Sequence, residues 1–253
     1  MIYEDLKGKK VLVTGAGSGI GMATAVMFSK QGAFVGVHYF RTEDGAKKTL
    51  RQVKKNSDGV LVRADVRDET QVKQMVEQFA RAAGGIDILV NNAGTMIDRQ
   101  TFETGSLEYH ENVYATNVRS VFLVTRAALP YLKKSKGAII NIGSLAGHSG
   151  GGTGSGMYAG AKAAVATETI AMAKEFGKYR IRVNSVMPGF IETRFHEMFS
   201  SPDRYEEVAK KTPLGRNGTA NDVANAILFL ASEAASFITG EYIAVNGGLL
   251  MRA

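Results

Sequence analysis

The run Thr14-Gly15-Ala16-Gly17-Ser18-Gly19-Ile20-Gly21 joins a short apolar segment, residues 10–14, to a helix-length segment, residues 22–30. Glycines at such a turn let backbone amides approach a phosphate at the positive end of the helix, because no Cβ stands in the way. The spacing departs from the G-x-G-x-x-G pattern, since Ile20 occupies the place of the last glycine. Taken alone, the run is also compatible with an ordinary tight turn.

Outward from this turn, short β-rich segments alternate with longer helical ones. Seven strands are predicted, at residues 10–14, 33–39, 60–63, 86–90, 138–142, 182–186 and 242–245. The alternation implies right-handed β-α-β crossovers and a parallel sheet covered on both faces. We therefore expect an α/β fold, a single Rossmann-type doubly wound domain over residues 1–253, which binds its ligand at the carboxyl ends of the strands.

The composition is that of a globular protein, with 45% hydrophobic residues, 22% charged residues and no cysteine. Without cysteine there can be no disulfide, thiolate metal site or catalytic thiol, which suits a reducing compartment, and we expect no metal. Residues 1–10 lack the apolar stretch of a signal peptide, and no apolar run reaches the ~18 to 20 residues that span a bilayer. These features predict a soluble cytoplasmic protein with no membrane partner.

The net charge of +7 raises the possibility of nucleic-acid binding. The charges are scattered, however, and no run of aromatic residues accompanies them for base stacking. The densest basic group falls on a predicted exposed helix face and comprises Lys47, Lys48, Arg51, Lys54 and Lys55. We expect a solvated face there and no nucleic-acid partner, so that a nucleotide phosphate is the expected anion.

The end of the second strand bears on which nucleotide is bound. An acidic residue there would accept hydrogen bonds from the adenosine ribose and repel a 2′-phosphate. Tyr39 stands where that carboxylate is expected, and Arg41 is a cation able to pair with a phosphate. These two residues favour NADP(H). NAD(H) is the alternative, because Ser18 adds no positive charge to the glycine turn. Arg41 in a merely solvated position is the competing interpretation, and Thr42 looks like a helix N-cap.

Further motifs follow the strands in a set order. Together with the glycine run they resemble the classical short-chain dehydrogenase/reductase family over nearly the whole chain: Asp65-Val66, Asn91-Asn92-Ala93-Gly94, Asn117, Ser144, Tyr158-x-x-x-Lys162 and Pro188-Gly189. The resemblance implies a cofactor site that includes Gly15, Ser18, Gly19, Ile20 and Gly21, with the adenine on Asp65 and Val66. It also implies that the turn at residues 91–94 and Pro188-Gly189 lie along the cofactor, and that Thr193 and the backbone of Ile191 hold the nicotinamide amide.

The reacting groups can be argued from chemistry. Tyr158 and Lys162 are four positions apart in a predicted helix, residues 157–176, so their side chains share a face. An adjacent ammonium is expected to lower the pKa of the phenol from ~10, which helps it exchange protons near neutrality. Ser144 can stabilise the charge that grows on the substrate oxygen. By resemblance, Asn117 holds a water that connects Lys162 to solvent. An exposed helix pair is the alternative for Tyr158 and Lys162.

Two irregular segments, residues 145–156 and 189–215, are expected to form the substrate rim. Fourteen positions separate Ser144 from Tyr158, and the intervening residues are rich in glycine. A flexible loop is one explanation, and a wide polar mouth for a hydrophilic substrate is the other.

Three functions remain open. The resemblance includes 3-oxoacyl-carrier-protein reductases, and Lys133, Lys134 and Lys136 could meet an acidic acyl carrier protein. It also includes sugar and polyol dehydrogenases, and polar residues near the rim suit these or a keto-acid dehydrogenase: His148, Arg194 and His196. A non-catalytic nucleotide sensor on the same fold is the third.

A homotetramer is also expected. The predicted helices at residues 107–132 and 157–176 carry more apolar residues than one sheet face seems to need: Val113, Val121, Val124, Ala128, Ala161, Val165 and Met172. Residues 237–248 are expected to form an edge strand and its exit, which has to be covered. The resemblance implies that these two regions are buried about perpendicular two-fold axes.

Overall fold

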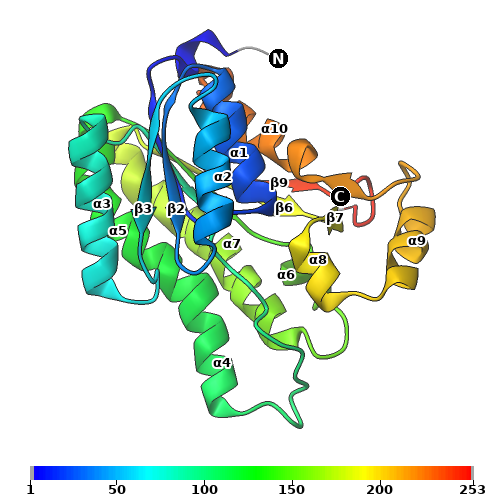
Figure 1. Ribbon diagram of the computed structural model, residues 1–253. Helices are drawn as coiled ribbons and strands as arrows, with labels where there is room; N and C mark the ends of the chain where they lie inside the picture. Colours follow the sequence, from blue (N-terminus) through cyan, green and yellow to red (C-terminus); the bar gives the residue numbers. More distant parts are fainter. Residues whose placement is uncertain (1–2, 252–253) are drawn as a thin grey trace.

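A parallel sheet forms the centre of the computed structural model, which describes residues 3–251 (Figure 1). Within that range the sheet has seven strands in the order β3-β2-β1-β4-β5-β6-β9, and every neighbouring pair is parallel. The bounds are β1 Lys10–Val13, β2 Phe34–Tyr39, β3 Gly59–Arg63, β4 Ile88–Asn91, β5 Ala138–Ile142, β6 Arg182–Pro188 and β9 Tyr242–Val245. The predicted doubly wound α/β fold is confirmed.

Helices cover both faces of the sheet, as Figure 1 shows. The helices α1 (Gly19–Lys30), α2 (Glu43–Val53) and α10 (Ala220–Ala231) share one apolar core with the sheet. A second core, on the other side, contains α3 (Glu69–Ala83), α5 (Ser120–Ser135) and the C-terminal end of α7 (Gly156–Phe176). The two cores arise because alternate apolar side chains of each buried strand point to opposite faces.

The smaller elements follow the strands on the ligand side of the sheet or join its layers. The helices are α4 Leu107–Tyr114, α6 Ala146–Ser149, α8 Arg194–Phe199 and α9 Pro202–Lys211, with single turns η1 Glu4–Leu6, η3 Gly177–Tyr179 and η4 Glu233–Ala235. A two-stranded sheet of β7 (Ile191–Glu192) and β8 (Gly218–Thr219), which the sequence pattern did not predict, ties the segment after β6 to the start of α10.

The predicted strands agree with the structure to within a few residues, and those at residues 138–142 and 242–245 agree at both ends. The helix predicted at residues 107–132 is interrupted, however. A π-helical turn, η2 (Ala115–Arg119), separates α4 from α5. The first helix begins at Gly19 rather than Met22, because Ser18 is extended and occupies the N-cap position. Thr42 is the N-cap of α2 as expected, although its side chain makes no capping bond.

The strand order reverses next to β1. Its neighbours are β2 on one side and β4 on the other, so the connections that leave β1 and β4 diverge to opposite faces. Their carboxyl ends consequently open a crevice, which is where doubly wound sheets bind ligands.

The apolar surplus that suggested an interface is not there. Six of the seven side chains named for it are buried within the chain itself: Val113, Val121, Val124, Ala128, Ala161 and Val165. The prediction that they face another subunit is wrong, because α5 and α7 pack on the sheet, on the π-helical turn and on α4. The expectation of β9 at the edge of the sheet is confirmed.

The basic group on α2 and just after its end is exposed, as predicted for a solvated face: Lys47, Lys48, Arg51, Lys54 and Lys55. Lys47 pairs with Glu43 one turn earlier on the same helix. No helix in residues 3–251 combines the length and the apolar character needed to cross a membrane.

Candidate active site

A cleft of about 990 Å³ opens at the carboxyl ends of the strands, and most of the predicted site residues line it. The lining includes Gly15, Ser18, Gly19, Ile20, Tyr39, Arg41, Asp65, Val66, Asn92, Ala93, Gly94, Ser144, Tyr158, Lys162, Pro188, Gly189, Ile191 and Thr193. Three predicted site residues lie behind this surface: Gly21, Asn91 and Asn117. The Asn91 amide is buried and donates to Thr125 Oγ1 and Asn141 Oδ1, so its place is in the packing under the cleft.

The glycine turn is a close-packed cradle. Gly15 has φ +64°, which glycine adopts without strain. A Cβ at Gly21 would collide with the Gly15 carbonyl oxygen and the Asn92 side chain. Gly21 therefore lies packed inside the turn and not on the surface of the cleft. The exposed Ser18 and the first turn of α1 face the cleft. Free amides at the N-terminus of a 12-residue helix fit the pyrophosphate of a dinucleotide.

His38 fixes this cradle from behind, and sequence reasoning missed it. Its Nδ1 accepts from the Gly15 amide at 2.9 Å, and its Nε2 lies 3.1 Å from the Ala64 carbonyl oxygen. The ring is 1% exposed, and burial lowers its pKa to about 4, so it is neutral at pH 7. Its one ring proton therefore sits on Nε2. The local sequence around His38 did not indicate this role, because Gly15 and Ala64, which it contacts, are distant from it in the chain.

The end of the cleft next to β2 and β3 combines an exposed cation, Arg41, with a carboxylate, Asp65, that is paired with an arginine. Arg41 is exposed and lies 5.3 Å from the centre of the Phe40 ring. The Asp65 carboxylate is bound by both Nε and Nη2 of Arg67, and this hydrogen bonding holds its pKa below the usual range. Arg67, which also lines the cleft, was not identified from the sequence. Asp65 thus reaches the cleft with its charge already paired.

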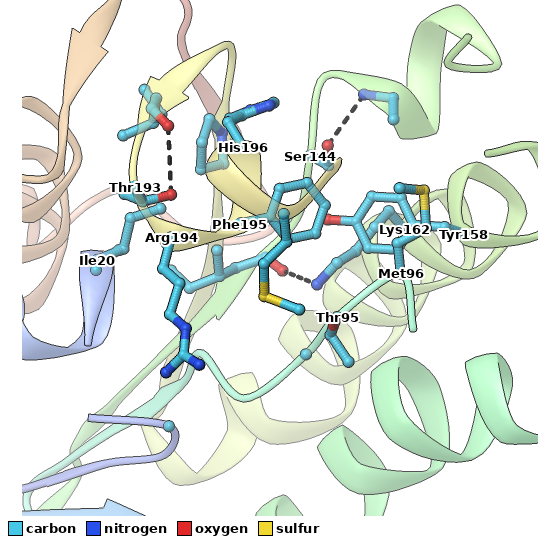
Figure 2. A pocket seen from close by; sticks show the side chains of 18 of the residues that line it. Ile20, Thr95, Met96, Ser144, Tyr158, Lys162, Thr193, Arg194, Phe195 and His196 are labelled. Atoms are coloured by element: carbon cyan, nitrogen blue, oxygen red, sulfur yellow. Dashed lines mark hydrogen bonds between the residues drawn. The ribbon is translucent and has the colours of Figure 1, made fainter. Parts of the chain in front are cut away.

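Tyr158, Lys162 and Ser144 meet at the other end of the cleft, as Figure 2 shows. Burial raises the pKa of Tyr158 to about 12, against a hydrogen bond with Ser144 that lowers it. Lys162 is 5% exposed, donates to the Ile142 carbonyl oxygen at 2.8 Å, and has its pKa lowered to about 8 by burial. Its Nζ lies 5.7 Å from the centre of the Tyr158 ring. The expected lowering of the phenol pKa by Lys162 is therefore not found in the chain alone: burial dominates the shift, and the cause that opposes it is Ser144.

Asn117 lies in the π-helical turn and reaches the same place. Its Nδ2 donates to the carbonyl oxygens of Thr95 and Val113, while its Oδ1 is buried without a hydrogen-bond partner among the described residues. A Cβ built on Gly94 would lie 2.6 Å from that Oδ1 and 3.2 Å from Lys162 Nζ. The two side chains therefore flank one small space. π-Helical turns are frequent at functional sites because the extra residue redirects a side chain.

Both irregular segments border the cleft. Residues 145–156 contribute Leu145, Ala146, Ser149, Gly151, Gly152 and Ser155, and the segment after β6 contributes Phe190, Arg194, Phe195, His196, Met198 and Arg204. Arg194 makes no hydrogen bond or ion pair with any described residue. His196 stacks on Phe190 with ring centres 3.8 Å apart, and burial lowers its pKa to about 4.

Two sequence-based suggestions about the surroundings are wrong. His148 packs against the Tyr242 ring at 5.1 Å between centres and is not part of the lining. The lysines Lys133, Lys134 and Lys136 lie at the end of α5, just before β5 begins. They are therefore at the amino edge of the sheet, opposite the cleft. Among the described residues, no group of three or more His, Asp or Glu side chains gathers to hold a metal ion.

Comparison with known proteins places the chain. A family model described as enoyl-(acyl carrier protein) reductase matches residues 15–250. The chain is 39% identical to the 3-oxoacyl-[acyl-carrier-protein] reductase FabG of Thermotoga maritima, covering 97% of this chain and 99% of that protein. The FabG protein of Escherichia coli is 38% identical, covering 98% and 99%.

The chain belongs to the short-chain dehydrogenase/reductase family. It is an oxidoreductase that interconverts a carbonyl and an alcohol with a nicotinamide cofactor. Solved structures agree with this. An NADH-dependent reductase responsible for alginate metabolism has a TM-score of 0.91 at 35% identity and covers 99% of this chain and 100% of its own. A 7α-hydroxysteroid dehydrogenase complexed with NADH and a 7-oxo bile acid has a TM-score of 0.91 at 31% identity, covering 97% and 96%.

Proposed function

We propose that Tyr158 is the proton donor for carbonyl reduction and that Ser144 orients the substrate oxygen. The observation that carries this is the meeting of the Tyr158 and Ser144 side chains in the cleft, where Ser144 lowers the pKa of the phenol against the effect of burial. With a pKa of about 12, Tyr158 is protonated at neutral pH and ready to donate. The nicotinamide cofactor supplies the hydride to the carbonyl carbon. Tyr158 then gives its proton to the oxygen while the Ser144 hydroxyl stabilises the developing charge.

Lys162 and Asn117 are proposed to restore that proton. Lys162 keeps most of its charge at neutral pH, and its ammonium stabilises the phenolate left after the transfer. The unpartnered Oδ1 of Asn117, close to Lys162 Nζ, supports a role in holding a water on the route to solvent.

NADP(H) is the proposed cofactor, supported by Tyr39 at the end of β2 and by the exposed guanidinium of Arg41. Replacing Arg41 with alanine should raise the KM for NADPH at least about tenfold and change that for NADH little, because a charge-assisted bond to the 2′-phosphate is worth about 1.5–3 kcal/mol. Steady-state kinetics with both cofactors test this. An equal effect on both KM values would show that Arg41 is only solvated, and a wild-type preference for NADH would refute the choice of NADP(H).

The first candidate substrate is a 3-oxoacyl thioester on an acyl carrier protein. Support comes from the FabG relatives, which match this chain over nearly their whole length. The proposal includes a cytoplasmic location and a homotetrameric assembly.

The second candidate is a sugar or keto acid with a carboxylate. Arg194 supports it, because this unpaired guanidinium lines the cleft and can bind a carboxylate through two hydrogen bonds. The similarity to a reductase of alginate metabolism points the same way.

One assay separates these candidates. NADPH and NADH oxidation is followed with an acetoacetyl thioester, with keto acids and uronic-acid-derived ketones, and with uncharged ketones of matched size. Reduction of the thioester with no preference for carboxylates supports the first candidate. A carboxylate preference that Arg194→Ala abolishes supports the second. Oxidation of neither cofactor with any of these carbonyls would reject both candidates.

A further inference from the structure

The segment after β4 enters the mouth of the cleft through a strained turn. Ile97 has φ +70°, and the Asp98 amide donates to the Met96 carbonyl oxygen at 2.9 Å. A hydrogen bond between residues two apart around a positive φ defines a γ-turn, which is strained and rare. A β-branched residue in this region is strained, and such strain persists only where the surrounding structure imposes it.

Tyr109 supplies that restraint. This residue, in α4, is 6% exposed, and its hydroxyl contacts the carbonyl oxygens of Met96 at 3.2 Å and Asp98 at 2.6 Å. The γ-turn is thereby held on both sides of Ile97. The next residue along the chain, Arg99, leaves the turn in a fixed direction.

Arg99 uses its guanidinium to join the two rims of the cleft. Its Nε and Nη2 donate to the Phe199 carbonyl oxygen at 3.1 and 2.9 Å, and its Nη1 donates to the Thr153 carbonyl oxygen at 3.0 Å. The neighbouring Gln100 amide adds a bond to the Gly154 carbonyl oxygen at 3.1 Å. The glycine-rich rim and the end of α8 are thus tied to one residue that belongs to neither.

The hydrogen bonds of Arg99 to Phe199 hold α8 in place, and α8 carries side chains that lie close to Tyr158. Phe199 is the last residue of α8, and Phe195, one turn earlier, lies with its ring 5.6 Å from the Tyr158 ring. Figure 2 shows Phe195 beside Tyr158, with Arg194 directed along the cleft. A shift of α8 would move both side chains at once.

We propose that Arg99 is a positioning residue, a clasp that holds α8 and the glycine-rich rim together around the carbonyl substrate. Each of its three nitrogens donates to a backbone oxygen of one of the two rims, and on these contacts we assign it a role that acts through the rims. The strained turn at Ile97 and the Tyr109 hydroxyl aim it. The proposal holds for either candidate substrate, since both need the same walls around the reacting carbon.

Amide hydrogen exchange of the full chain, without any ligand, tests the clasp directly. Replacing Arg99 with alanine should speed exchange roughly tenfold in residues 150–155 and 194–200 together, and leave β5 unchanged. Lysine at this position, which cannot reach both oxygens, should give an intermediate rate in at least one rim. The matched control is Arg204→Ala, which removes the same charge from the cleft but pairs only with Glu207 on its own helix. Unchanged exchange in either rim, or an equal change in the control, would overturn the proposal.

Kinetics add a second measurement. The Arg99→Ala variant should raise the KM of an accepted carbonyl substrate about tenfold while the KM for the nicotinamide cofactor stays within about twofold. Tyr109→Phe should change both the exchange and the substrate KM in the same direction by a smaller factor. An equal rise in both KM values would indicate general damage and contradict a clasp. Because exchange needs no substrate, failure of the proposed function cannot be mistaken for failure of the clasp.

Discussion

At the scale of single residues, the phenol of Tyr158 can be removed with little change of shape. We expect Tyr158→Phe to lower turnover by roughly two orders of magnitude or more while cofactor binding stays nearly intact, because only the proton donor is lost. Turnover and cofactor titration on the same preparation check this. Undiminished turnover would refute the role of Tyr158.

Lys162→Ala should reduce turnover to a similar extent for a different reason. It removes the buried ammonium that faces the phenolate and also the bond to the Ile142 carbonyl oxygen. We propose that Lys162 also binds the nicotinamide ribose, as the resemblance to the family implies, so cofactor affinity should fall as well. Unchanged affinity together with unchanged turnover would remove Lys162 from the site.

His38 predicts how the stability depends on pH. Its pKa is about 4 in the folded chain and about 6.5 in an unfolded one, so the unfolded state binds more protons between these values. Its contribution to stability is therefore complete above pH 6.5 and is lost as the pH falls towards 4, by on the order of 3 kcal/mol. Urea unfolding at several pH values gives the free energy of unfolding as a function of pH. Between pH 4 and 6.5 this free energy should change less steeply with pH in His38→Gln than in the wild type. Equal slopes would show that protonation of His38 is not linked to unfolding.

At the scale of elements, the sequence predicted correctly those features that depend on residues close together in the chain. The strands follow from apolar runs, and the glycine turn and Tyr158-x-x-x-Lys162 follow from spacing. The π-helical turn at Ala115–Arg119 has no such signal, because apolar periodicity continues through it. The contacts of His38 with Gly15 and of Arg99 with Phe199 join residues distant in the chain, and no single sequence can reveal them. The raised pKa of Tyr158 was missed because it depends on how deeply the phenol is buried.

The turn between β1 and α1 requires a residue without a side chain at position 21. We expect Gly21→Ala to destabilise the chain by about 1–3 kcal/mol, since its Cβ would collide with the Gly15 carbonyl oxygen, and to weaken cofactor binding by distorting the turn. Thermal unfolding and cofactor titration measure the two effects. Gly177→Ala is the matched control, because a Cβ there meets nothing within 4 Å, and it should be neutral or slightly stabilising. Equal behaviour of the two variants would contradict the cradle.

At the scale of the whole molecule, the homotetramer remains a prediction with a changed basis. The side chains first held to mark an interface are buried within the chain, yet α4 and α5 expose Leu107 and Phe122, which are 73% and 52% accessible. Phe237, fully accessible, lies before the edge strand β9, so a second apolar surface adjoins the open edge. Two such faces on perpendicular two-fold axes would close four chains into one particle.

Light scattering at micromolar concentration should give four times the 27.1 kDa of one chain. Phe122→Asp should halve that mass if the α4 and α5 face is correctly identified, because the carboxylate would have to lose its hydration when this face is buried in an interface. A wild-type mass of one chain would defeat the prediction, and a dimer would leave only one of the two faces as an interface.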